Sequence, residues 1–204
     1  MELGSETAAA LAHEVKNPLS LIKMNVDYIK SCLNKEFDDN FEIIEREIGR
    51  ISNIVTGFTF NRQPVYLRAL LRSILNEYDI SLKNKNISFE IDCDTDISVQ
   101  GDYEKLNILF FNLIKNSVEA IDESGEVKIG ISCEKNEVKV RIDDTGKGIS
   151  PEIMEKIGQP YNTDKTGGTG LGLAICKSIV NEHRGRINFE NTENGCRVTV
   201  SLKA

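Results

Sequence analysis

The chain has 204 residues, a length typical of one large domain or two small ones. Its 32 acidic and 25 basic residues leave a formal charge of −7, which disfavours a general nucleic-acid-binding surface. The sequence contains no apolar run long enough to cross a bilayer and no secretion signal at its start. Five scattered cysteines without a CxxC pair, and only two histidines, support neither a disulfide framework nor a zinc site. We therefore expect a reducing compartment and no nucleic-acid or membrane partner.

Apolar residues in the first third of the chain recur at steps of three and four. They form one stripe from Ala8 to Leu33 and another from Phe41 to Phe58, the pattern of two amphipathic helices. The break between them is short, so we expect an antiparallel hairpin. Two helices cannot enclose both stripes, and we predict that two copies pair as a four-helix bundle, a homodimer. The alternative is that both helices pack on the rest of the same chain.

The helical pattern ends near Pro64, because a proline disfavours helical geometry in the preceding residue. We place a domain boundary there, with domains at 1–63 and 64–204. The mixed periods of the second domain predict an α/β fold, in which helices cover one face of a sheet. The expected helices span about 67–84, 103–121 and 171–182, with a short one after Pro151. The expected strands span 87–91, 186–189, 197–202 and a hairpin formed by 126–132 and 137–143.

Glycines immediately precede the last predicted helix, in KTGGTGLGLAICKSIV. Gly168, Gly170 and Gly172 leave the first N–H groups of this helix uncovered, which suits an anion such as a phosphate chain. The spacing is neither a Rossmann fingerprint nor a Walker loop. A flexible loop that caps the helix is an equally simple interpretation.

A carboxylate and two glycines follow a predicted strand in DDTGKGI, residues 143–149. A carboxylate at this place can accept the amino hydrogens of adenine, whereas guanine presents an oxygen there and would be repelled. The neighbouring glycines let a flat base approach the backbone. Taken alone, the segment is also compatible with an ordinary turn.

Three polar residues share one face of a predicted apolar helix in LFFNLIKNSVEAI, namely Asn112, Asn116 and Glu119. A neutral Asn oxygen holds magnesium only weakly, so a metal at this face would arrive with a nucleotide and be shared with its phosphate oxygens. Satisfaction of the amides by nearby backbone is the alternative.

His13 lies off the apolar stripe of the first helix, in AHEVKNPL, and is expected to face water. A neutral imidazole is nucleophilic at ordinary pH, and Glu14 can hold its other ring N–H. Asn17 lies one turn further on the same face. Pro18 removes the N–H that would bond the carbonyl of Glu14, which predicts a kink. A lone surface histidine usually has no function, but a proline inside the helix beside it needs a reason.

These motifs, in this order, resemble the cytoplasmic core of bacterial sensor histidine kinases over essentially the whole chain. The matching boxes are HEVKNPL, NLIKNSVEA, DDTGKGI and PYNTDKTGGTGLGL. The short segment before the last glycines is similar to that of sporulation and nitrogen-regulation kinases. The resemblance implies that the first domain is a dimerisation and phosphotransfer hairpin. It implies that the second is the ATP-binding α/β sandwich shared with Hsp90 chaperones.

The resemblance also implies a role for each matching residue. His13 matches the phosphoacceptor, Glu14 the residue that assists autophosphorylation, and Asn17 the residue that orients water during dephosphorylation of the partner. Asn116 matches the magnesium ligand and Asp144 the carboxylate that reads adenine. The other residues implied in nucleotide binding are Asn112, Gly146, Gly148, Tyr161, Lys165, Gly168, Gly170, Leu171 and Gly172.

The implied activity is that of a transferase, a protein histidine kinase of two-component signal transduction. With ATP and magnesium it would phosphorylate His13, pass the group to an aspartate of a response-regulator receiver domain, and dephosphorylate that partner. An ATP-driven clamp or chaperone is one rival, which HEVKNPL disfavours. A phosphotransfer scaffold without kinase activity is another, which the intact asparagine and glycine boxes disfavour. We expect a cytoplasmic piece of a longer protein, whose membrane attachment stays open.

Overall fold

A computed structural model of the chain describes residues 60–81, 85–93, 97–158 and 172–204, together with Leu19, Ile22 and Val26. The chain divides into two compact units, Met1–Asn61 and Arg62–Ala204. In the first unit Leu19, Ile22 and Val26 are helical; Leu19 and Val26 are buried, whereas Ile22 is 48% exposed. The rest of the predicted hairpin and its dimeric pairing lie outside the described residues.

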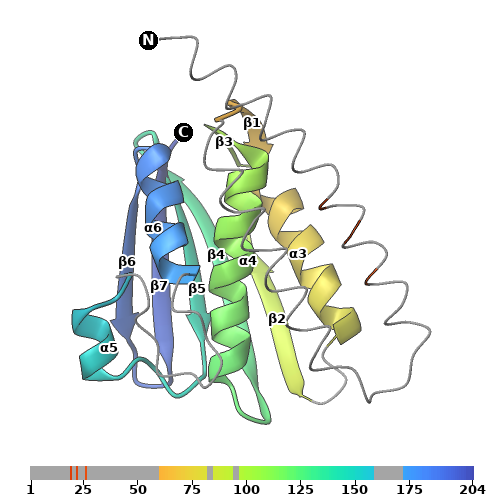
Figure 1. Cartoon of the computed structure of the whole chain (residues 1–204), viewed down its shortest axis with the longest axis vertical. Coiled ribbons are helices and arrows are strands. Elements are labelled where there is room, and N and C mark those ends of the chain that lie inside the picture. Colours follow the sequence, from red (N-terminus) through yellow and green to blue (C-terminus); the bar gives the residue numbers. More distant parts are fainter. Residues whose placement is uncertain are drawn as a thin grey trace. The chain divides into compact units, whose positions relative to one another are not determined.

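The second unit is built on a mixed five-stranded sheet with the order β2-β4-β5-β7-β6 (Figure 1). The first pair, β2 and β4, is parallel, and the other three pairs are antiparallel. A separate two-stranded sheet pairs β1 with β3. The strands are β1 (Gln63–Tyr66), β2 (Asn86–Asp92), β3 (Ser98–Gly101), β4 (Ser124–Glu134), β5 (Glu137–Asp144), β6 (Arg186–Asn191) and β7 (Cys196–Lys203).

Helices cover one face of the large sheet, as the sequence predicts (Figure 1). They are α3 (Leu67–Ser81), α4 (Tyr103–Ala120) and α6 (Gly172–Glu182), with the short α5 (Pro151–Glu155) beyond them. Alternate residues of the central strands, such as Val127, Val140 and Val200, point into a single core with apolar residues of the helices. Burial of this apolar surface is the main force that holds the helices on the sheet.

The predicted hairpin is confirmed as β4 and β5, which pair from Val127 with Asp144 to Glu134 with Glu137. Lys135 and Asn136 connect them with φ angles of 48° and 67°. Two consecutive positive φ angles are typical of the type I′ turn, whose twist matches that of the flanking strands. The hairpin therefore fixes the register that brings Asp144 to the end of β5.

Two strands were not predicted, namely β1 and β3, each of four residues. Strands this short carry too few alternations for a periodicity signal. The sequence predicts only a domain boundary at Pro64, yet this residue pairs with Gln100 in the two-stranded sheet, where a proline is tolerated at an edge. The predicted helix at 67–84 is described as far as Ser81.

Both ends of α4 are held by side chains. Asp102 caps its N-terminus, where its carboxylate accepts the N–H of Lys105 at 3.1 Å. At the other end the ammonium of Lys85 donates to the carbonyl oxygen of Val118 at 3.1 Å and to that of Ile121. The last carbonyls of a helix favour a cation. These contacts satisfy backbone groups that have no partner within the helix at each of its ends. None of the described helices has the length and hydropathy of a bilayer span.

Candidate functional site

Asp144 is the last residue of β5 and is only 6% exposed. Its Oδ1 accepts the backbone N–H of Gly146 at 3.0 Å and that of Cys196 at 3.2 Å. Because two amides from different parts of the chain hold one oxygen, the plane of the carboxylate is fixed. No hydrogen bond joins its other oxygen, Oδ2, to a described residue, so this oxygen can accept from a ligand.

Cys196, the first residue of β7, contributes its backbone N–H to this arrangement rather than a reactive sulfur. Burial raises the pKa of the Cys196 thiol to about 12, with further contributions from the charges of Asp144, Asp143 and Glu190. A thiol with so high a pKa stays protonated at neutral pH and is a poor nucleophile.

Gly146 packs against the C-terminal end of α4. A Cβ at this position would lie 2.6 Å from the Cβ of Ala120 and 2.8 Å from its carbonyl oxygen. The next residue, Lys147, donates its N–H to the same carbonyl at 3.1 Å. The approach of a base to Gly146 remains a prediction, but close packing on α4 already gives this position a reason to be glycine.

Gly148 has a φ of 74°, in the left-handed region of backbone conformation, which is strained for a residue that has a side chain. The adjoining Ile149 is held by Asn191 of β6 through two bonds. Asn191 Oδ1 accepts the N–H of Ile149 and its Nδ2 donates to the carbonyl of Ile149, both at 2.8 Å. No local sequence pattern marks Asn191, because the contact joins residues 42 positions apart.

Asn112, Asn116 and Ala120 occupy successive turns of α4 and form a stripe about 12 Å long. A Cβ on Gly172, the first residue of α6, would lie 3.1 Å from Oδ1 of Asn112. The loop after β5 meets the other end of the stripe at Ala120. Asn116 therefore lies between the start of α6 and the loop that follows Asp144. Asn112, Gly172 and the loop that follows Asp144 therefore lie along one face of α4.

The amides of this stripe differ in their partners. Asn112 Nδ2 donates to the carbonyl of Ile108 at 2.8 Å, as the backbone alternative predicted. The side chain of Asn116 is partly buried and has no hydrogen bond to a described residue, so its oxygen fits a role as a ligand to a metal that a nucleotide brings. Glu119 forms an ion pair with Lys115 at 3.8 Å.

Eight of the predicted site residues lie outside the described part of the chain. They are His13, Glu14, Asn17, Tyr161, Lys165, Gly168, Gly170 and Leu171. Within the described residues, no group of three or more His, Cys, Asp or Glu side chains could hold a metal ion.

Gly195, a second residue that no sequence motif marks, packs directly on the backbone of Asp144. A Cβ at Gly195 would lie 2.1 Å from the carbonyl oxygen of Asp144. We predict that Gly195→Ala lowers the free energy of unfolding by about 3 kcal/mol, because the buried backbone must shift. Gly130→Ala is the matched control, since its Cβ would come no closer than 3.6 Å to Arg141. Equal urea midpoints for the two variants would contradict this packing argument.

Two known protein families match separate parts of the chain. Residues 101–204 match the family described as "Histidine kinase-, DNA gyrase B-, and HSP90-like ATPase". Residues 5–64 match the "His Kinase A (phospho-acceptor) domain". Sporulation kinase B of Bacillus subtilis is 34% identical over 100% of this chain and 50% of its own length. The chain spans half the length, or less, of the curated relatives that it matches.

Solved structures agree with this assignment. The catalytic domain of histidine kinase ThkA is 36% identical with a TM-score of 0.62, covering 70% of this chain and 95% of that one. ThkA in complex with the response regulator protein TrrA has 29% identity and a TM-score of 0.64, covering 97% and 61%. The predicted fold class, a helical phosphoacceptor hairpin followed by an α/β sandwich, is confirmed. The chain belongs to the histidine kinases, with a His Kinase A domain followed by an ATPase domain of the kind shared with DNA gyrase B and HSP90.

Proposed function

We propose that the chain is the catalytic core of a protein histidine kinase that acts in two-component signal transduction. Residues 1–63 carry the phosphoacceptor and residues 64–204 bind ATP. The observation that carries the proposal is that the loop after Asp144 packs on Ala120 and the start of α6 lies against Asn112, one helical turn on either side of Asn116. This site belongs to a chain whose other part matches a phosphoacceptor domain.

Each described residue of the site has a distinct task in this proposal. The free oxygen of Asp144 accepts a hydrogen from the amino group of adenine. The start of α6, at Gly172, offers backbone N–H groups to the phosphates. Asn116 contributes its amide oxygen to a magnesium ion, which when bound neutralises phosphate charge. The remaining proposed nucleotide contacts are Asn112, Gly146, Gly148, Tyr161, Lys165, Gly168, Gly170 and Leu171.

The proposed reaction is a phosphoryl transfer to His13. A bond forms between a ring nitrogen and the γ-phosphorus while the bond to the bridging oxygen of ADP breaks, and Glu14 holds the other ring N–H. Positioning and charge neutralisation account for most of the catalysis in transfers of this kind. The group then passes to an aspartate of a receiver domain.

We further propose that the protein works as a homodimer with a response regulator, and that Asn17 orients water when the regulator is dephosphorylated. The phosphoacceptor-domain match supports the dimer, and the complex of ThkA with TrrA supports the partner. Because ATP and receiver domains are found in the cytoplasm, we place the reaction there.

Labelling with ATP that carries ³²P at the γ position tests the function. The kinase proposal predicts protein-bound label that acid removes and base does not, as expected for phosphohistidine. A clamp or chaperone would hydrolyse ATP without labelling itself. A phosphotransfer scaffold would take label only from a phosphorylated receiver domain. Either of these two results would contradict the kinase proposal.

Asn116→Ala is expected to remove the magnesium-dependent part of nucleotide affinity. Calorimetry with an ATP analogue, in magnesium and in EDTA, measures that part directly. Wild type should bind at least ~10-fold more tightly with magnesium, the equivalent of about 1.4 kcal/mol, and the variant should show almost no difference. Asn107→Ala, on another face of the same helix, is the control and should behave as wild type. A full magnesium effect in Asn116→Ala would refute the assigned ligand.

A further inference from the structure

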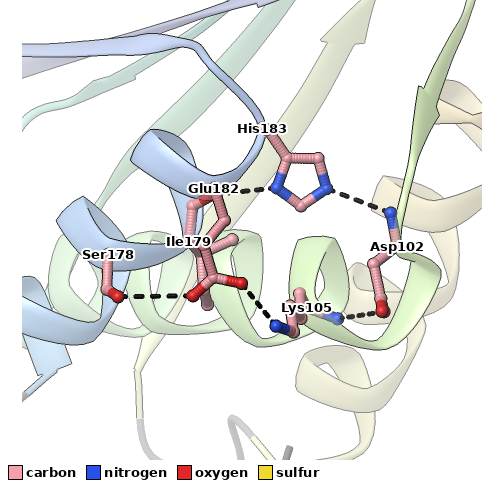
Figure 2. A network of polar contacts seen from close by, with 6 residues as sticks. All are labelled: Asp102, Lys105, Ser178, Ile179, Glu182 and His183. Atoms are coloured by element: carbon pink, nitrogen blue, oxygen red, sulfur yellow. Dashed lines mark hydrogen bonds and ion pairs between the residues drawn. The ribbon is translucent and has the colours of Figure 1, made fainter. Parts of the chain in front are cut away.

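His183 is a buried side chain that joins the end of α6 to the start of α4 (Figure 2). It is 7% exposed. Its Nε2 accepts the backbone N–H of Asp102 at 3.0 Å, and its Nδ1 donates to the carbonyl oxygen of Ile179 at 2.8 Å. An N–H can only donate and a carbonyl can only accept, so these partners require a neutral ring with its proton on Nδ1. The ring packs closely on Gly101 of β3, where an added Cβ would lie 2.8 Å from Nε2 of His183.

A second contact joins the same two helix ends. Lys105, a buried residue in the first turn of α4, forms an ion pair with Glu182, the last residue of α6. Glu182 also accepts the hydroxyl of Ser178 at 3.4 Å. Figure 2 shows that these side chains and His183 form a connected network of polar contacts between the end of α6 and the start of α4. The C-terminal end of α6 is therefore clamped to the N-terminal end of α4.

The other end of this helix pair carries part of the proposed nucleotide site. The helices are antiparallel, because Glu182 meets Lys105 whereas Gly172 meets Asn112. These two points are about 10 Å apart along α4 and about 15 Å apart along α6. Between them, the thiol of Cys176 lies 3.7 Å from the carbonyl oxygen of Leu109. A helix is stiff over this length. The contacts of His183 and of Lys105 at one end of α6 therefore determine where Gly172, at its other end, lies relative to Asn112 and Asn116.

We propose that His183 is a positioning residue whose neutral imidazole holds α6 against α4, so that its protonation weakens nucleotide binding at the opposite end of the helix pair. This inference rests on the proposed function, because it assumes that nucleotide binds at Gly172 and Asn116. Protonation would place an N–H of the ring against the N–H of Asp102, and the hydrogen bond would be lost.

The surroundings of the ring fix the direction of the pH effect. Burial lowers the pKa of His183; the bond to Ile179 and the charges of Asp102 and Glu182 oppose this, and Lys105 adds to it. These three charged groups come from the start of α4 and the end of α6, the two elements that the ring joins. The pKa of His183 is lower in the folded state than in the unfolded state. The neutral ring and its hydrogen bonds therefore contribute their full stabilisation of the folded state above about pH 6.5. The contribution is lost as the pH falls below that value.

His183→Gln tests the inference, because the glutamine Oε1 can accept the N–H of Asp102 and does not titrate. Both chains should carry His13→Gln, since His13 and His183 are the two histidines of the protein. Affinity for an ATP analogue with magnesium is measured from pH 8 to pH 5.5. Relative to His183→Gln, the chain with His183 should lose affinity steadily as the pH falls and its ring takes up a proton, toward a factor of about five, the usual scale of coupling between distant sites.

The outcomes separate the inference from the function on which it rests. If neither chain binds the analogue at pH 8, the proposed function fails. If both bind at pH 8 and their pH profiles coincide, the positioning role of His183 is wrong.

A second measurement leaves His183 intact and covers the case in which His183→Gln does not fold. In the His13→Gln chain, His183 is the single histidine, so its ring-proton NMR signal needs no further assignment. By linkage, saturating nucleotide should lower the pKa of His183 further. An unchanged titration midpoint would overturn the inference.

Discussion

Replacing His13 by glutamine is expected to reduce label incorporation from γ-labelled ATP to background while nucleotide affinity stays within about twofold. Glutamine preserves much of the size and polarity of the side chain but has no nucleophilic ring nitrogen. The proposed nucleotide site lies in the other compact unit of the chain, so its residues are untouched. Acid-labile label, counted after base treatment, measures the first effect. The chain has no tryptophan, so calorimetry or a fluorescent nucleotide measures the second.

This result has an internal control, because binding and labelling are measured on the same variant. Loss of both activities would indicate that the substitution damages the fold, and a thermal melt would show it. Base-stable label that persists at wild-type level in His13→Gln would place the phosphoacceptor elsewhere and remove the central assignment.

Asp144→Asn is expected to reverse the choice of nucleotide base. The asparagine Oδ1 can still accept the N–H groups of Gly146 and Cys196, whose contacts determine which way the side chain points. Its NH₂ group then replaces the carboxylate oxygen that faces the ligand. The asparagine NH₂ and the amino group of adenine are both hydrogen-bond donors, so they would repel each other. The affinity for ATP should therefore fall about 100-fold. Inosine triphosphate presents a carbonyl oxygen there and should be preferred by the variant.

Competition of ATP and inosine triphosphate against a fluorescent nucleotide measures this preference. Asp143→Asn is the matched control, because Asp143 lies next to Asp144 but pairs with Arg141 at 2.9 Å and with Arg197. It should keep the wild-type preference and lose at most about 1 kcal/mol of stability, as is usual for partly exposed ion pairs. A variant at position 144 that still prefers ATP would place the base elsewhere.

Much of the second unit follows from local patterns. The apolar period of α4 and α6 and the alternation of β4 and β5 predict these elements within a few residues, because each buries one face against the same core. The motifs that contain Asn116, Asp144 and Gly172 were identified in the same way, since each couples a polar residue to a predicted helix or strand. The short strands β1 and β3 escaped prediction because four residues carry almost no period.

The amino-acid sequence by itself determined the order of the helices and longer strands of the second unit, the family and the candidate chemical groups, because these depend on residue types at short spacings. Only the tertiary structure decided how those groups are supported. Asn191 holds Ile149 across 42 positions, and His183 holds Asp102 across 81. Gly195 packs on the carbonyl of Asp144. Such contacts arise when separate elements pack on one core, and a periodicity that extends over a single helix or strand contains no information about which distant backbone it will meet.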